Sequence, residues 1–568
     1  MTEDFRKTAP APLAPVPFNI SKPFETTLEN GLKVVVFEDK RLPIVSFRLA
    51  FQVGEANDAS DAVGQTSAMV SMLNEGTQNR TSKQLAEEVE RLGAHLSASS
   101  NSDNTVVAAS ALSFYSTDIL SLMAEIVLKP TFPEGELSLY KQNTIENLKF
   151  QRSQPNFLAD EQISRILFGE HPYHVASPTP ADIDSITREK LIDLHAKRFI
   201  PNVATFIVVG NIGKDEILQQ IKDIFDGWQK GSVEENEFPA PAERTETTLT
   251  IVDRPGSAQS NIVVSNLAIN RNNDDYFAFL VMNQVLGAGA SSRLFMNLRE
   301  EKGYTYGAYS SIDARRLAGS FEATSEVRTT VTGDSLKEFF YELNRIRDEK
   351  VSEEELTDAK NFLTGVFPIR AETQEGLTNL IVSQQLYNLP EDYLQTYREK
   401  INEITLEDVE RVAKKYITPE KIAVVIVGDA ENVLEQVKSY ANTIEIFDTE
   451  GNPQNMENYN QDESVEAANV AGKWNLKLEA MGQELAVVLI LEQNGNDVSG
   501  SLETMLGNGE ITYGRVKGNQ LTATAVAEVQ GQSAEFTISG TVEGDSMSGS
   551  LSTQMIPMPL DFTGTREQ

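Results

Sequence analysis

Residues 186–210 read ITREKLIDLHAKRFIPNVATFIVVG, and residues 404–428 read ITLEDVERVAKKYITPEKIAVVIVG. The two stretches align without a gap at an offset of 218 residues. The aligned pairs include a threonine, a proline and a glycine: Thr187 with Thr405, Pro201 with Pro419 and Gly210 with Gly428. Each copy predicts a threonine-capped amphipathic helix, a proline that stops it, and a β-branched strand that ends at glycine. The match therefore predicts two copies of one module.

The first module extends from about Phe24 to Trp228, and the second from about Thr247 to Tyr440. The elements expected early in the first module are strands at 26–28, 32–38 and 44–53 and helices at 65–73 and 82–92. Asn30-Gly31, between the first two strands, is typical of a tight hairpin turn. After each glycine-ended strand a further helix is expected, starting near Lys214 and Asn432. Strands followed by helices, then a strand and a helix, predict an α+β fold with antiparallel sheets packed with helices on one face.

Composition changes mark the remaining parts of the chain. Residues 230–246 are polar and contain proline, and residues 446–471 are rich in Asn, Glu and Gln, so both stretches are predicted linkers. Short alternating segments then recur at 474–479, 486–493, 498–504, 521–529, 534–542 and 547–554. They predict an antiparallel sandwich or barrel that serves docking or stability. The predicted organisation is an N-terminal extension (1–23), a first module (24–229), a linker (230–246), a second module (247–445), an acidic linker (446–471) and an all-β domain (472–568).

Bulk properties exclude several classes of function. The chain has 568 residues, which is too long for one core. Its net charge of −35 repels phosphate backbones, so nucleic-acid binding is not expected. It has no cysteine, which excludes disulfides and thiolate chemistry. No apolar run is long enough for a membrane span, and the first 20 residues do not resemble a secretion signal. We expect a soluble cytoplasmic protein, or a periplasmic one if the chain is a processed form.

Three stretches of the duplicated frame resemble the pitrilysin and insulinase group of metallopeptidases (the inverzincins), which includes mitochondrial processing peptidase. They are LENGLKVVVFEDKRLP (28–43), VGQTSAMVSMLNEGTQNRTSKQLAEEVERLGAHLSASSNSD (63–103) and VLGAGASSRLFMNLREEKGYTYGAYSS (285–311). With the repeat, the resemblance covers about Phe24 to Tyr440. The third stretch is the most specific of the three.

The zinc motif of this group, H-x-x-E-H, is absent from the matching helix. The two histidine positions fall on Ser67 and Ser71, the glutamate falls on Val70, and the third ligand position falls on Asn147. A serine hydroxyl is a poor zinc ligand and valine cannot act as a base, so this chain is expected to bind no metal. The pair His171 and His174, with Pro172 between them, is expected to lie in a packed or surface loop.

A second functional element of the family is retained. The resemblance implies that Arg299 and Tyr306, seven residues apart, hold the substrate across the zinc site. A guanidinium offers charged donors to peptide carbonyls, and a phenol can donate to the oxyanion that forms during hydrolysis. Gly303 is expected to let the chain turn from helix into strand. The alternative is structural: an arginine that balances a helix end and a tyrosine that packs on a sheet.

The resemblance therefore implies a non-catalytic, substrate-binding subunit of a heterodimeric zinc metallopeptidase. Its partner would be an H-x-x-E-H chain that carries the zinc, and an extended peptide would bind as an added strand at a sheet edge. Whether the chain counts as an enzyme is left open, since no activity is expected from it alone. Two alternatives also stay open: an inactive scaffold of the same fold with the β domain as its binding module, and a stand-alone enzyme of an unrelated kind, for which no constellation is visible.

Overall fold

The computed structural model describes residues 18–232, 237–459, 467–480, 483–504, 507–529, 532–553 and 556–567. It forms two compact units: one comprises residues up to 247 with 263–325 and 337–424, and the other comprises 248–262, 326–336 and 425–568. Most of the predicted N-terminal extension and parts of both predicted linkers lie outside the described residues. Across the described ranges, no helix combines the length and apolar character that a membrane crossing requires.

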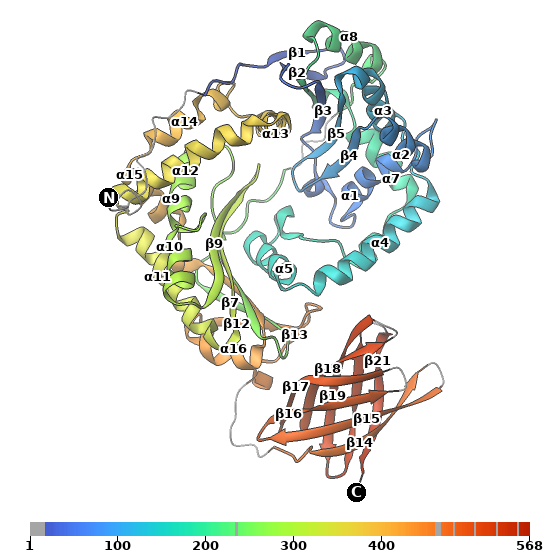
Figure 1. Cartoon of the computed structure of the whole chain (residues 1–568), viewed down its shortest axis with the longest axis vertical. Coiled ribbons are helices and arrows are strands. Elements are labelled where there is room, and N and C mark those ends of the chain that lie inside the picture. The colour runs from blue at the N-terminus through green and yellow to red at the C-terminus, as the bar shows by residue number, and fades with distance from the viewer. Residues whose placement is uncertain are drawn as a thin grey trace, which may run out of the picture. The chain divides into compact units, whose positions relative to one another are not determined.

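The first module contains a six-stranded sheet (Figure 1). Its strands are β1 (Phe24–Thr27), β2 (Lys33–Glu38), β3 (Ile44–Phe51), β4 (His95–Ser100), β5 (Thr105–Leu112) and β6 (Ala204–Gly210). Their order across the sheet is β1-β2-β6-β3-β5-β4. Four of the five neighbouring pairs run antiparallel, and the pair β2–β6 is parallel.

The helices of this module are α1 (Gln65–Ser71), α2 (Ser82–Arg91), α3 (Ser116–Leu128), α4 (Glu134–Arg152), α5 (Pro155–Phe168), α6 (Pro180–Ser185), α7 (Arg188–Arg198) and α8 (Lys214–Phe225). Alternation along β3 shows how the sheet is covered, because successive side chains point to opposite faces. Phe47 and Leu49 enter the helix-covered core. Ser46 and Arg48 are also buried, on the other face, where α13 (Gln374–Leu386) of the second module lies.

The second module repeats this topology. Its strands are β7 (Thr248–Asp253), β8 (Gln259–Leu267), β9 (Thr305–Ala314), β10 (Gly319–Arg328), β11 (Ala423–Gly428), β12 (Thr443–Phe447) and β13 (Pro453–Gln454). Their order is β13-β12-β7-β11-β8-β10-β9. When β7 to β11 are matched in chain order with β2 to β6, these five strands follow the same spatial order in both sheets. β13 lies within the stretch that composition predicts as a linker.

The other helices of the second module are α9 (Tyr276–Leu286), α10 (Arg293–Phe295), α11 (Thr332–Asp348), α12 (Glu353–Glu372), α14 (Tyr393–Glu403), α15 (Leu406–Tyr416) and α16 (Ala430–Val437), with a π-helical turn, η7 (Met296–Glu301), after α10. The repeated stretch forms α7 and β6 in one module and α15 and β11 in the other. Thr187 and Thr405 accept N-cap hydrogen bonds, from the amides of Lys190 at 3.3 Å and Asp408 at 3.2 Å. These contacts confirm the cap, helix and strand pattern predicted for both copies.

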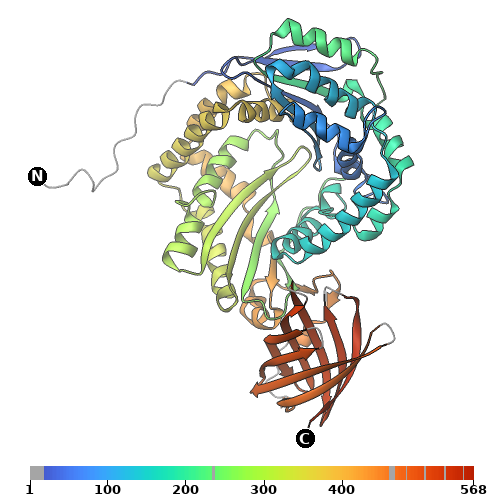
Figure 2. The same cartoon turned by 45° about the vertical axis from the view of Figure 1, so that its right-hand side comes forward.

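The C-terminal part is a closed eight-stranded barrel, which decides between the predicted sandwich and barrel (Figure 2). Its strands are β14 (Gly472–Ala480), β15 (Gln483–Asn494), β16 (Asp497–Thr504), β17 (Gly507–Lys517), β18 (Gln520–Val529), β19 (Gln532–Glu543), β20 (Ser546–Thr553) and β21 (Ile556–Arg566). Six of them match predicted segments, whereas β17 and β21 were not predicted. Antiparallel pairing of β14 with β21 closes the barrel around Trp474, Leu489 and Ile538.

Candidate functional site

Helix α1 carries three of the four positions at which the family holds its zinc ligands and base. The helix begins after Gly64, whose φ of +82° lies in the left-handed region that favours glycine. Val70 is 1% exposed and packs in the core of the first module. Ser67 is half-buried and Ser71 is exposed on the same face, since they are four residues apart. The fourth position, Asn147, is exposed on α4.

Tyr140 of α4 occupies the space beside the two serines. Burial raises the pKa of its hydroxyl, and the nearby hydroxyls of Ser67, Thr144 and Ser71 partly oppose that rise. Tyr140 and Asn147 are seven residues apart and therefore lie on one face of α4. The group facing α1 is thus a set of neutral hydroxyls and an amide. Zinc prefers imidazole, thiolate and carboxylate donors, so these residues do not fit that ion.

The four histidines do not supply a metal site elsewhere. His171 is buried, and its Nδ1 accepts a hydrogen bond from the amide of Tyr173 at 3.1 Å. His174 Nδ1 lies 2.9 Å from the His171 carbonyl, and His195 Nε2 lies 2.8 Å from the Val127 carbonyl. His95 is exposed on β4. Among the described residues, no cluster of three or more His, Cys, Asp or Glu side chains could hold a metal ion.

Arg299 lies in η7, directly before the strand that carries Tyr306. Its guanidinium is 4.9 Å from the ring centre of Phe295, and Nη1 is 3.3 Å from Glu300 Oε1. The side chain is 45% exposed, so solvent reaches part of the guanidinium. Gly303 then adopts a φ of +64°, and its amide donates to the Arg299 carbonyl at 3.2 Å. This left-handed turn joins helix to strand as expected from the sequence.

Tyr306 stands near the start of β9, the edge strand of the second sheet. The residue is 90% exposed, which is unusual for one with so much apolar surface. In the described part of the chain, its hydroxyl has no hydrogen-bond partner, and no contact joins it or Arg299 to Ser67, Ser71 or Asn147. Tyr309, also exposed, packs its ring 5.6 Å from Phe295 beneath Arg299. The pair is therefore displayed outward from η7 and β9.

Two features were not predicted from the sequence. The first is Tyr140, to which only its seven-residue spacing from Asn147 points in the sequence. That spacing becomes informative only when α4 is known to lie beside α1. The second is Glu322 of β10, whose pKa is raised to about 7 by burial and by the charges of Asp160 and Asp313. These three carboxylates come from three separate elements, so no local pattern in the sequence connects them.

Comparisons with known proteins agree with this geometry. Residues 33–179 match the sequence model of the insulinase family (peptidase family M16), and residues 185–363 match the model described as the peptidase M16 inactive domain. The chain is 23% identical over 402 residues to an uncharacterized zinc protease of Mycobacterium leprae, covering 69% of this chain and 88% of that protein. It is 22% identical over 404 residues to a Helicobacter pylori protein called a non-peptidase homolog, covering 70% and 93%.

Two solved structures are also similar. A Pseudomonas fluorescens structure described as a peptidase M16 inactive domain superposes with a TM-score of 0.68 at 28% identity, covering 72% of this chain and 98% of that one. A Helicobacter pylori protease superposes with a TM-score of 0.65 at 20% identity, which is a likeness of fold. The barrel lies outside both ranges matched by the family models.

Proposed function

Because the chain belongs to the M16 (insulinase) family of peptidases and holds Ser67, Val70 and Ser71 where the zinc motif would stand, we propose that it is the substrate-binding, non-catalytic subunit of a heterodimeric zinc metallopeptidase. The partner chain would carry H-x-x-E-H and the zinc ion. This chain would contribute Arg299 and Tyr306 to peptide hydrolysis in the partner's site.

The exposure of Tyr306 is the observation that carries this proposal. A tyrosine that served only to pack a sheet would bury its ring, yet Tyr306 is 90% exposed on an edge strand. A guanidinium and a phenol displayed together suit an extended peptide: the first can hold carbonyl oxygens, and the second can donate to the oxyanion. The unpaired edge of β9 offers main-chain groups for an added strand.

The proposal also includes a peptide substrate, a zinc ion bound by the partner chain, and a cytoplasmic location. Its first test is a tagged purification from native cells, followed by mass spectrometry of the proteins that co-elute. A stoichiometric chain with H-x-x-E-H is the expected result. Elution alone, or with partners that lack the motif, contradicts the heterodimer.

The residue assignment is tested on the purified complex. Arg299→Ala and Tyr306→Phe should each lower kcat/KM by roughly 10²–10³, the usual loss for one oxyanion-type donor. Two variants serve as matched controls: Tyr304→Phe, a tyrosine two residues earlier, and Glu300→Gln, which removes the carboxylate beside Arg299. Both controls should retain activity. A loss below about threefold for Arg299→Ala and Tyr306→Phe, with the complex intact, rejects the assignment.

The second candidate is an inactive scaffold whose barrel is the binding module. The observation that favours it is the barrel itself, which is closed, has its own core and lies outside the matched family ranges. Under this hypothesis the Arg299 and Tyr306 variants leave every activity of the complex unchanged, and removal of residues 467–568 abolishes partner binding.

A further inference from the structure

A cavity of about 360 Å³ within the first unit lies between elements of the two modules. One wall comes from the first module, through α5 and the residues around Tyr173. The other wall comes from the second module, through β9, β10 and the turn between them. The cavity therefore lies where α5 meets the β9–β10 hairpin, which carries Tyr306. This boundary is called the seam, and the hairpin is called the β9–β10 ribbon.

The charges on this seam are mostly of one sign. The titratable and charged side chains that line the cavity are Glu55, Asp160, Tyr173, Asp313, Arg315 and Glu322. Two of the carboxylates have polar partners: Arg315 Nε donates to Asp313 Oδ2 at 2.6 Å, and Ser100 Oγ donates to Glu55 Oε1 at 2.7 Å. Asp160 of α5 and Glu322 of β10 form no ion pair with a cation in the described part of the chain. They face each other from opposite walls.

Beside the cavity, the tip of the β9–β10 ribbon is held to the first module by neutral and charge-assisted hydrogen bonds. The buried carboxylate of Asp103 accepts from the amide of Arg316 at 2.9 Å and from the hydroxyl of Tyr173. The Leu317 amide donates to that same hydroxyl at 3.3 Å. The Arg315 guanidinium lies 4.8 Å from the ring centre of Tyr173. These contacts pull the two walls together, whereas the unpaired carboxylates push them apart.

Among the carboxylates that line the cavity, Glu322 has a pKa raised to near neutral. Burial, with the charges of Asp160 and Asp313, raises the pKa of Glu322 to about 7. Burial raises the pKa of Tyr173, which stays protonated, and burial lowers the pKa of nearby His171, which stays neutral above about pH 6.5. Ionisation of Glu322 between pH 6 and pH 8 therefore adds a negative charge to the seam.

We propose that the seam between α5 and the β9–β10 ribbon is a proton-operated latch, closed when Glu322 is protonated and loosened when Glu322 and Asp160 are both ionised. Two like charges that share a partly dry cavity repel each other, and protonation of one removes the repulsion. The Asp103 hydrogen bonds then hold the ribbon tip against the first module. The latch sets how freely β9 moves, and it operates in this chain whether or not a catalytic partner exists.

Hydrogen–deuterium exchange of the full chain tests the latch directly. Peptides that cover α5 and residues 313–320 are compared at pH 6 and pH 8.5, after correction for the intrinsic pH dependence of exchange. The wild type should lose about tenfold or more of its protection in both segments at the higher pH. Protection of β2 and β6, which lie away from the seam, should stay constant.

Two variants remove the repulsion from opposite walls: Glu322→Gln on β10 and Asp160→Asn on α5. Each should keep α5 and 313–320 protected at both pH values. Glu326→Gln is the matched control, because Glu326 is an exposed carboxylate of the same strand, and it should behave like the wild type. Equal protection of the wild type at pH 6 and pH 8.5 overturns the proposal. Retention of the pH response in both Glu322→Gln and Asp160→Asn overturns it as well.

Discussion

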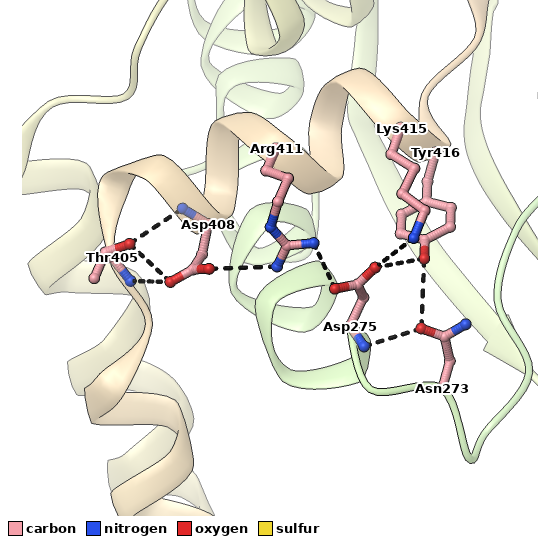
Figure 3. Close-up of polar contacts among 7 residues, drawn as sticks. All are labelled: Asn273, Asp275, Thr405, Asp408, Arg411, Lys415 and Tyr416. Carbon is pink, nitrogen blue, oxygen red and sulfur yellow. Dashed lines mark hydrogen bonds and ion pairs between the residues drawn. The ribbon is translucent and has the colours of Figure 1, made fainter.

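Asp275 provides a sharp test of how the repeated helix is held in the second module. Its carboxylate precedes α9 and accepts hydrogen bonds from three side chains of α15: Arg411 at 2.6 Å, Lys415 at 2.9 Å and the Tyr416 hydroxyl at 2.6 Å (Figure 3). Burial opposes ionisation, but these three donors outweigh it and lower the pKa of Asp275 from 3.8 to about 2. Asp275→Asn removes the charge while it keeps the shape.

The size of the effect follows from that difference in pKa. Each pKa unit corresponds to about 1.4 kcal/mol, so the ionised carboxylate contributes about 2 kcal/mol to the free energy of unfolding. Because the pKa in the folded state lies below the ordinary value, this contribution is complete above pH 3.8 and disappears as the pH falls through 2. At pH 7 the variant should therefore unfold roughly 4–8 °C below the wild type.

Differential scanning fluorimetry from pH 7 down to pH 3 measures this prediction. The gap between wild type and Asp275→Asn should be widest at pH 7 and should narrow toward pH 3. Asp274→Asn changes the adjacent, exposed carboxylate and should leave the melting temperature unchanged. A gap that stays constant with pH, or an equal loss in the Asp274 variant, would refute the reasoning.

Two further predictions concern the barrel and the positions that correspond to the family's zinc site. Leu489→Ala should destabilise the barrel by about 2–5 kcal/mol, because Leu489 is fully buried in its core. Ile490, the next residue, is 36% exposed, so Ile490→Ala should change stability by about 0.5 kcal/mol or less. Urea unfolding followed by tryptophan fluorescence compares the two variants. Restoration of the zinc motif by Ser67→His, Val70→Glu, Ser71→His and Asn147→Glu should bring zinc binding in a metal titration only when Tyr140→Ala is added, since the Tyr140 side chain is half-buried beside Ser67 and Ser71. Zinc binding with Tyr140 in place would show that the tyrosine is no obstacle.

Much of the fold could be predicted because its signals are local. A capping threonine, a stopping proline and a terminal glycine act on their own neighbours, so Thr187, Pro201 and Gly210 mark α7 and β6 without knowledge of the rest of the chain. The same holds for the turn at Gly303. β17 and β21 escaped prediction because glycine, proline and polar residues interrupt their alternation. In a closed barrel, pairing on both edges stabilises such strands despite their weak intrinsic preference.

In the candidate site, too, some residues could be predicted from the sequence and others could not. Arg299 and Tyr306 could be singled out from their spacing within a resemblance, and both are exposed in the structure, while their role in binding a ligand stays a prediction. Tyr140 and Glu322 could not be predicted, since each acquires its environment from an element distant in the chain. A pKa near 7 for Glu322 depends on α5 facing β10, and that arrangement is a property of tertiary packing alone.

The two copies of the module show how the same backbone frame forms with different side chains. In the first module Arg198, aligned with Tyr416, donates to Asp58 at 2.8 Å, and Asp58 accepts from the Thr66 amide at the start of α1. A carboxylate before the first helix thus contacts the last turn of the repeated helix in both modules: at the aligned position it accepts from a guanidinium in one and from a phenol in the other, where Arg411 and Lys415 also donate. Backbone positions are set by caps, breakers and packing, which tolerate such exchanges. The same reasoning applies to α1: Val70 packs in the core of the first module, and Ser67 lies beside the half-buried Tyr140 of α4, so the frame accommodates other side chains at the positions of the zinc motif.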